Sequence, residues 1–401
     1  MNGLKVRKSD IELFLILVGI CIPQGIAGIG VVSKVSTFIK LIAFLYAGIL
    51  VLKKTVKLDI FFWTWTIYFA IMLASTLINS GNMSTLVSKY YPLLAMIVLA
   101  KYFVMHREAD TIKVVGILFT GILVLNSILG VLYQTTLMSD VAVYLLGIRT
   151  RINDLAYIGI VFAFALPLIY RKGWIWTGLG CVSAIHFIIN QKVSTSYICI
   201  PMLILLIVLS LKKTKLLTDN SIKIYWIIIL INILVISGGM LSRFGWFFSD
   251  VLGEDATLTG RTNIWRSVLA TMPGKWVLGH GIGTIRSFLV VTNNTTATHS
   301  QLLNELYNGG LVGVALFVII AYLVVKKCKE RGDAFAGLVA SGIFATQIAM
   351  ISEVVCDSNF YNIYLILCYY LLFVVPPIYH KNSQEELKDL FQCGEAKNEF
   401  K

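Results

Sequence analysis

The chain has 401 residues, of which 57% are hydrophobic and 14% are charged, and its formal net charge is +13. This composition excludes a soluble globular protein, because too few polar residues are present to cover a surface in water. Lipid is therefore the expected solvent for most of the chain. The excess of Lys and Arg is interpreted first as a topology signal and not as a nucleic-acid-binding surface.

Twelve apolar segments follow one another along the chain, each near the length of about 20 residues that crosses a bilayer as a helix. The first ten residues contain Lys5, Arg7 and Lys8, and the apolar stretch after them lacks a small-residue cleavage site. This favours an uncleaved first span over a signal peptide. The predicted spans are 11–32, 35–52, 59–79, 86–104, 114–133, 153–170, 173–190, 193–211, 222–239, 309–325, 334–352 and 359–379.

The basic residues orient these spans. With the N-terminus in the cytoplasm, 23 of the 34 Lys and Arg residues fall on the cytoplasmic side, and every inner connection is basic. This predicts an all-α polytopic membrane bundle, a single domain over residues 1–379, with both termini cytoplasmic. The charged tail 380–401 then lies in the cytoplasm, and the one long insertion, 240–308, forms a large helical extracytoplasmic loop.

The orientation restricts the chemistry of the two outer loops, 134–152 and 240–308. No ATP is present outside the plasma membrane. A reaction catalysed there must use a donor that is already activated; otherwise the protein is a channel or a carrier.

Basic residues on the outer side are mostly arginines. Arg presents a planar fork that binds phosphate or carboxylate through two hydrogen bonds. From these residues alone, an anion site and a set of interfacial anchors both remain open. The outer basic residues in question are Arg149, Arg151, Arg243, Arg261, Arg266, Lys275 and Arg286.

The large loop contains a predicted helix in TLTGRTNIWRSVLATMPG, which ends before Pro273-Gly274. Arg261 and Trp265 are four residues apart and share one face of it. The alternative is that Trp265 packs on the membrane surface with Arg261 beside it. The next motif, LGHGIG, predicts a tight turn with close backbone approach, and its His280 is interpreted as structural.

A second helix start is predicted in TATHSQLLNELYNGG. Thr298 and Gln301 have the spacing of a capping box, which makes His299 the first residue of the helix, and Gly309-Gly310 break or bend it. A helix N-terminus disfavours the imidazolium, so His299 is expected to be neutral and able to accept a proton from a hydroxyl group. The alternative is a capping or interfacial histidine.

The other polar residues of the loop carry weaker signals. No histidines have metal-ligand spacing, so neither a metal nor a cofactor is expected. The outer-loop acids are interpreted as solvated or capping residues; they are Asp250, Glu254, Asp255 and Glu305.

Three motifs occur in a fixed order from about Gly260 to Gly313: T-G-R-x-x-I-W, L-G-x-G-I-G and H-S-x-L-L-N-x-L-x-x-G-G-L-x-G. In this order they resemble the O-antigen ligase and polymerase superfamily of bacterial inner-membrane proteins. The resemblance implies a GT-C-like fold and metal-independent glycosyl transfer from an undecaprenyl-pyrophosphate-linked glycan. It implies that Arg261 engages the pyrophosphate and that His299 activates the acceptor hydroxyl.

The resemblance is incomplete in one place. Ligases of the superfamily commonly carry a Thr-Arg or Ser-Arg step before a Pro at the outer start of a middle span. Here the stretch is NQKVSTSYICIP, with Ser194 near the expected Arg, and Lys192 could supply the charge as a point cation. Arg149 and Arg151 resemble, less specifically, a basic outer-loop element of the polymerases.

These residues favour a polymerase that joins lipid-linked repeat units into a surface polysaccharide, either O-antigen or capsule. A ligase that moves the finished glycan to lipid A core or another acceptor is the first alternative. A flippase or transporter is the second, although mid-span positions nearly free of charge argue against ion-coupled transport. The expected partners are a lipid-linked donor and acceptor, the bilayer and a candidate chain-length regulator, with no nucleic acid. The predicted catalytic pair is His299 and Arg261, and the predicted substrate-binding residues are Arg149, Arg151, Lys192, Arg243, Arg266, Arg286 and Trp265.

Overall fold

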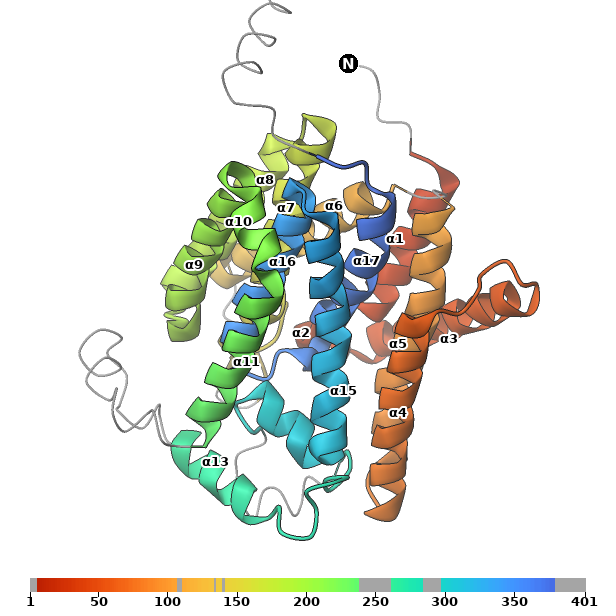
Figure 1. The fold of residues 1–401 in the computed structure, drawn as a ribbon, viewed down its shortest axis with the longest axis vertical. Coiled ribbons are helices and arrows are strands. Elements are labelled where there is room, and N and C mark those ends of the chain that lie inside the picture. The colour runs from red at the N-terminus through yellow and green to blue at the C-terminus, as the bar shows by residue number, and fades with distance from the viewer. Residues whose placement is uncertain are drawn as a thin grey trace, which may run out of the picture.

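The computed structural model describes residues 6–106, 110–132, 135–138, 141–237, 261–283 and 297–378. Helices form nearly all of this part of the chain (Figure 1). The longer helices are α1 (Lys8–Ile20), α3 (Gly30–Leu52), α4 (Ile60–Ile78), α5 (Met83–Met105), α6 (Thr111–Leu132), α7 (Ala156–Tyr170), α8 (Trp174–Asn190), α9 (Ser194–Lys212), α11 (Ser221–Ile236), α15 (Gln301–Arg331), α16 (Ala334–Ala349) and α17 (Phe360–Val374). The shorter ones are α2 (Gln24–Ala27), α10 (Thr214–Asp219), α13 (Arg261–Ala270) and the 3₁₀ turns η1 (Arg149–Asp154) and η2 (Cys356–Ser358).

Each predicted span contains a helix, but the first span differs from the expectation. A single helix over 11–32 was expected, whereas α1 ends at Ile20, α2 follows as a single turn and α3 begins at Gly30. Pro23 explains the break, because it lacks the N–H that would continue the helix and disfavours helical backbone in the residue before it.

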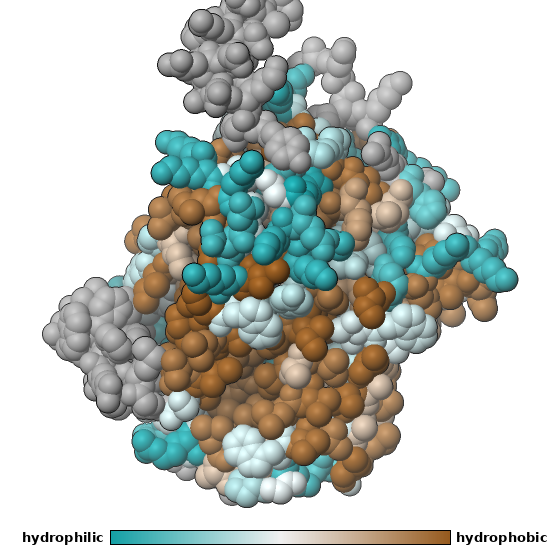
Figure 2. Space-filling view, viewed as in Figure 1, coloured by the Kyte–Doolittle hydropathy of each residue, from teal (hydrophilic) through white to brown (hydrophobic). Residues whose placement is uncertain are grey.

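The protein is a helical membrane protein. Within the described residues, seven helices are long and apolar enough to cross a bilayer, and α8, α11, α16 and α17 are shorter apolar helices. Figure 2 shows hydrophobic residues over the middle of one face and hydrophilic residues towards its two ends. This distribution is the one expected when lipid surrounds the middle of the bundle.

Two short strands occur in a segment that is predicted to be an outer loop. Residues 135–138 and 141–143 form the strands β1 (Thr135–Met138) and β2 (Val141–Val143), which pair antiparallel with Thr135 opposite Val143. This hairpin is a short addition to a fold that is otherwise helical in the described residues, as expected, and the β-branched residues of both strands favour extended backbone.

The core is built on α16 and α17. Nearly every residue of these two helices is buried, so their sequences are apolar on all sides. α9 and α7 pack against α16, α5 packs against α17, and α15 packs against α4. Two helix starts are fixed by acidic N-caps: Asp59 accepts a hydrogen bond from the Phe62 N–H at 3.0 Å, and Asp333 accepts one from the Ala336 N–H at 2.9 Å.

Connections that the topology places on one side of the membrane contact one another in the structure. On the predicted inner side, Lys101 Nζ donates to Asp59 Oδ2 at 2.7 Å, and the Arg331 guanidinium donates to the carbonyl oxygen of Leu372 at 3.0 Å. On the predicted outer side, the Asn82 N–H donates to the Ile282 carbonyl oxygen at 2.7 Å. Helix ends that are distant in the sequence therefore meet at both ends of the bundle. The predicted tail 380–401 lies outside the described residues.

Candidate functional site

The helix α13 positions Arg261 and Trp265 at the end of the bundle that is predicted to face outward. It begins at Arg261, ends at Ala270 and precedes Gly274, which has a φ of +76°. Trp265 is 1% exposed and donates from Nε1 to the Thr298 carbonyl oxygen at 2.9 Å. The two side chains share a face, as the spacing predicts, and this face packs on the segment that carries His299. Trp265 is therefore buried in protein and does not lie on the membrane surface.

The LGHGIG segment, residues 278–283, forms the close backbone approach that its glycines predict. Gly279, Gly281 and Gly283 all have φ between +73° and +80°, where side chains are strained. The Ile282 carbonyl oxygen accepts from the N-cap residue of α5, and the His280 N–H donates to the Tyr307 carbonyl oxygen at 2.6 Å. This turn therefore ties the start of α5 to the start of α15.

Gly310 provides the matching break in α15. Its φ of 64° and ψ of −164° are not helical, and a Cβ there would lie 2.2 Å from the Val277 carbonyl oxygen.

The His280 ring stacks on Tyr307 at 4.6 Å and its Nε2 lies 3.1 Å from the Thr271 carbonyl oxygen. The structural interpretation of His280 and the bend at Gly309-Gly310 are both confirmed.

His299 lies just outside α15, which corrects its predicted place. The N-cap is Ser300 and not Thr298, and His299 has a φ of +51°. Thr298 instead bonds within a local turn, because its Oγ1 donates to the Ser300 carbonyl oxygen at 2.8 Å. The short hydroxyl side chain of Thr298 competes with the helix for backbone partners, and this delays the first helical residue to Gln301.

The imidazole of His299 is neutral at ordinary pH. Burial lowers its pKa, and the nearby positive charges of Arg261 and Arg151 lower it further, to about 4. The expected neutral state is therefore found, but its cause is desolvation and the two guanidinium groups, not the end of a helix. Among the described residues, the ring makes no hydrogen bond.

Arg261 forms an ion pair that the sequence analysis did not predict. Its Nη2 donates to Glu353 Oε1 at 2.9 Å, and the two side chains are 14% and 11% exposed. The Nε of Arg261 is buried and has no hydrogen-bond partner among the described residues. Since a guanidinium has five N–H donors, Arg261 keeps donors for a second anion while Glu353 holds it in place.

Residues 350–359 connect α16 to α17, and we name them the α16–α17 turn. Arg151 lies in η1 and binds to this turn. Arg151 donates to the Val354 carbonyl oxygen at 2.8 Å and to Asp357 Oδ2 at 3.1 Å. Lys89 Nζ lies 3.5 Å from the other oxygen of Asp357. Burial by itself would raise the pKa of Asp357, but the charges of Lys89 and Arg151 outweigh it and hold that pKa below its ordinary value.

Gln301 and Glu305 join α15 to the same turn. The Gln301 side-chain oxygen accepts from the Val355 and Cys356 N–H groups at 2.9 and 3.0 Å, and its amide nitrogen donates to Glu305 at 2.7 Å. Glu305 is 3% exposed and also accepts from the Tyr68 hydroxyl at 2.6 Å. The interpretation of Glu305 as a solvated or capping acid is therefore wrong. The side chain is buried, and its hydrogen-bond partners are Tyr68 of α4 and Gln301, one turn earlier in α15.

The remaining predicted residues lie further out. Arg149 is exposed and donates to the Gln191 carbonyl oxygen at 3.4 Å. Lys192 is exposed at the end of α8, with a φ of +50°, and Arg266 is exposed on α13. Arg243 and Arg286 lie outside the described residues, as do Asp250, Glu254 and Asp255. Of the predicted set, the structure brings together Arg151, Arg261, Trp265 and His299.

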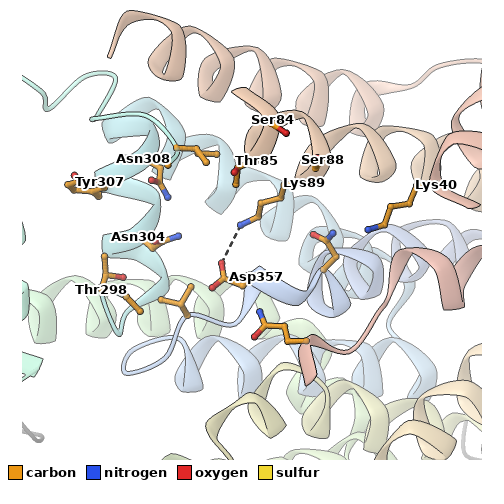
Figure 3. A pocket seen from close by; sticks show the side chains of 16 residues that line it. Lys40, Ser84, Thr85, Ser88, Lys89, Thr298, Asn304, Tyr307, Asn308 and Asp357 are labelled. Carbon is orange, nitrogen blue, oxygen red and sulfur yellow. Dashed lines mark hydrogen bonds and ion pairs between the residues drawn. The ribbon is translucent and has the colours of Figure 1, made fainter. Parts of the chain in front are cut away.

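A polar cavity of about 600 Å³ lies beside this group (Figure 3). The α16–α17 turn contributes Val354 and Asp357 to its wall, and Thr298, the neighbour of His299 in the chain, also lines it. Lys89 and Lys40 reach into it from α5 and α3 (Figure 3). Lys40 lies in the interior of a predicted span, so it is an exception to the expectation that the spans carry almost no charge.

The acids that hold these cations are not among the residues predicted from the sequence. Glu353 and Asp357 lie between two helices that are otherwise apolar, and Lys89 lies early in α5. Charged groups next to apolar spans are costly and usually have a function, so ISEVVCDSNF carried a usable signal. The arrangement combines two arginines with a neutral imidazole, which suits binding of an anion and removal of a proton from a hydroxyl group.

Comparison with known proteins identifies no relative. No protein-family model matches the chain, and neither a curated protein nor a solved structure matches it.

Proposed function

We propose that this protein is a glycan polymerase, which joins undecaprenyl-pyrophosphate-linked repeat units on the outer face of the bacterial plasma membrane. A hydroxyl oxygen of the acceptor glycan forms a bond to the anomeric carbon of the donor glycan. The bond from that carbon to the donor pyrophosphate breaks, and the lipid pyrophosphate leaves with the electron pair. The hydroxyl proton passes to His299. A GT-C-like fold belongs to the same proposal.

One observation carries this proposal: a neutral imidazole lies beside two arginines at one end of a membrane bundle, the end that the topology predicts to face outward. Burial and, after it, the positive charges of Arg261 and Arg151 lower the pKa of His299 to about 4, so both arginines lie within electrostatic reach of the imidazole. A pyrophosphate leaving group needs fixed positive charge where its own charge develops. An acceptor hydroxyl needs a base that is unprotonated at the working pH. Arg261 and His299 meet these two needs.

The proposal includes twelve membrane crossings with both termini in the cytoplasm. It predicts that alkaline phosphatase, fused to a chain truncated after Thr295, is active in the periplasm. Fusion after Lys213, at the inner end of α9, should give an inactive phosphatase, because this enzyme folds only outside the cytoplasm. An active fusion after Lys213 with an inactive one after Thr295 would reverse the topology and remove the argument about activated donors.

The lipid-linked glycans of a deletion strain test the reaction itself. A polymerase predicts loss of polymer, with a single repeat unit still transferred to the final acceptor. Accumulation of lipid-linked polymer would instead indicate the ligase reaction. Accumulation of single repeat units on the cytoplasmic leaflet would indicate a flippase. Plasmid-borne wild-type protein should restore the polymer, which controls for effects on neighbouring genes.

A further inference from the structure

The cavity beside the candidate site has the chemistry of a second substrate site. Its lining is rich in hydroxyl and amide groups, and its volume of about 600 Å³ is in the range of small-molecule pockets. Ser84, Thr85 and Ser88 come from the first two turns of α5, and Asn304 and Asn308 come from α15. Such groups bind sugar hydroxyls through hydrogen bonds in both directions.

Two lysines give the cavity its charge. Lys40 lies within α3, one of the helices long and apolar enough to cross the membrane, where a charged residue is costly. It makes no hydrogen bond or ion pair with any residue in the described part of the chain. Lys89 has one acidic partner, Asp357, and that carboxylate is shared with Arg151. Among the described residues of the lining, two lysines and one carboxylate give the cavity a net positive charge.

The cavity is separate from the Arg261 site but shares a wall with it. Val354 and Asp357 line the cavity, and the same two residues accept hydrogen bonds from Arg151. Arg261 and His299 do not line the cavity, whereas Thr298, the neighbour of His299, does. A ligand in the cavity can therefore extend past Thr298 towards His299 while a second anion occupies Arg261.

We propose that the cavity binds the acceptor, a second phosphate-bearing glycan, with its phosphate between Lys40 and Lys89. The hydroxyl and amide groups of α5 and α15 bind its sugars, and its terminal hydroxyl reaches His299 past Thr298. The acceptor role rests on the proposed function. The phosphate site itself rests only on the two lysines and the cavity.

Binding of inorganic pyrophosphate to the full-length protein in phosphatidylcholine nanodiscs tests the phosphate site. The quantity to follow is the pyrophosphate binding that persists after Arg261→Gln has removed the binding at Arg261. In that background, Lys40→Met and Lys89→Met should each weaken the binding by about tenfold, the value of one charge-assisted hydrogen bond. Lys40→Arg should retain this binding. Lys34→Met, an exposed position on the same helix outside the cavity, is the matched control and should have no effect. Unchanged pyrophosphate binding by both Lys40→Met and Lys89→Met would overturn the site.

Two further measurements are needed. The first distinguishes a lipid headgroup from a glycan-linked phosphate as the ligand, and the second distinguishes failure of the acceptor site from failure of the proposed polymerase function. Phosphatidylglycerol in the nanodiscs should compete only weakly with pyrophosphate; strong, Lys40-dependent competition would make the cavity a site for bulk anionic lipid and overturn the acceptor role. In glycan extension, Lys40→Met should raise the KM for the lipid-linked acceptor and leave the KM for the donor unchanged. If the wild-type protein extends no glycan but Lys40-dependent pyrophosphate binding remains, the polymerase fails and the anion site stands.

Discussion

Replacing His299 with alanine should reduce the rate of glycan chain extension by about 10²- to 10⁴-fold, the range that a positioned general base contributes. Within the described part of the chain the ring makes no hydrogen bond, so its loss leaves no hydrogen-bond partner unsatisfied among those residues. Both residues are L-amino acids at a φ of +51°, so the backbone cost is similar. The measurement is extension of lipid-linked repeat units by purified protein, read as a ladder on a gel. Long polymer made at the wild-type rate by a folded His299→Ala protein would exclude the mechanism.

The pH dependence gives an independent test of the same residue. In the free protein the pKa of His299 is about 4, so kcat/KM should not change as the pH falls from 8 until it approaches that value. Pyrophosphate bound to Arg261 and Arg151 would offset the two charges that depress this pKa. We therefore expect kcat, which reports the substrate complex, to fall at a higher pH than kcat/KM. Identical profiles for the two constants would contradict binding of the pyrophosphate beside His299.

His299 also links stability to pH. Its pKa in the folded protein lies below the unfolded value of 6.5, so the unfolded chain binds more protons between these two values. The stability that this group contributes is complete above pH 6.5 and is lost as the pH falls towards 4. Thermal unfolding should therefore show that the wild type loses more stability than His299→Ala as the pH falls from 7 to 4.

Arg261→Lys should lower the rate of extension by about 10²-fold, because one fixed donor to the leaving group is typically worth that much. Lysine keeps the positive charge beside Glu353 but loses the planar fork that can bind Glu353 and a phosphate together. Arg261→Ala should lower the rate further. It also breaks a buried ion pair, which can cost up to about 3–5 kcal/mol of stability. Arg261→Lys is therefore the cleaner variant, measured by extension rate and by pyrophosphate affinity.

Two matched variants accompany the Arg261 test. Arg266→Lys changes an exposed arginine on the same helix and should leave the rate within about twofold, as for most surface substitutions. Arg261→Ala combined with Glu353→Gln removes the unpaired charge and should recover much of the stability lost in Arg261→Ala, but not the activity. Full activity in Arg261→Lys, or recovered activity in the double variant, would limit Arg261 to a structural role.

The helices could be predicted from the sequence because lipid imposes a simple requirement. Every backbone N–H and C=O inside a bilayer must be paired within its own segment, so long apolar runs become helices. The predicted segment 59–79 and the helix α4 (Ile60–Ile78) agree closely for this reason. The first segment was wrong where Pro23 interrupts it. The strands β1 and β2 lie in a predicted loop, to which the same constraint does not apply.

The parts of the site that could be predicted are those that depend on residues close together in the sequence. The glycine spacing of residues 278–283 and the i to i+4 pair of Arg261 and Trp265 act within a few residues. Glu353 and Asp357 could not be paired with their arginines, because these partners lie 92 and 206 residues away in the chain and depend on how the helices pack. The start of α15 was misplaced by two residues for a local reason, since Thr298 bonds to Ser300 instead of capping the helix.

At position 299 the backbone is left-handed, so the residue that would best stabilise the fold differs from the residue that the proposed chemistry requires. Glycine or asparagine adopts a φ near +51° at lower cost than histidine, so either would favour the folded state. A stabilised version of this protein, selected by melting temperature alone, would therefore be drawn towards replacing the very side chain proposed to accept the proton. Engineering of a more robust protein for purification should begin by fixing residue 299 as histidine and seek its gains elsewhere in the bundle.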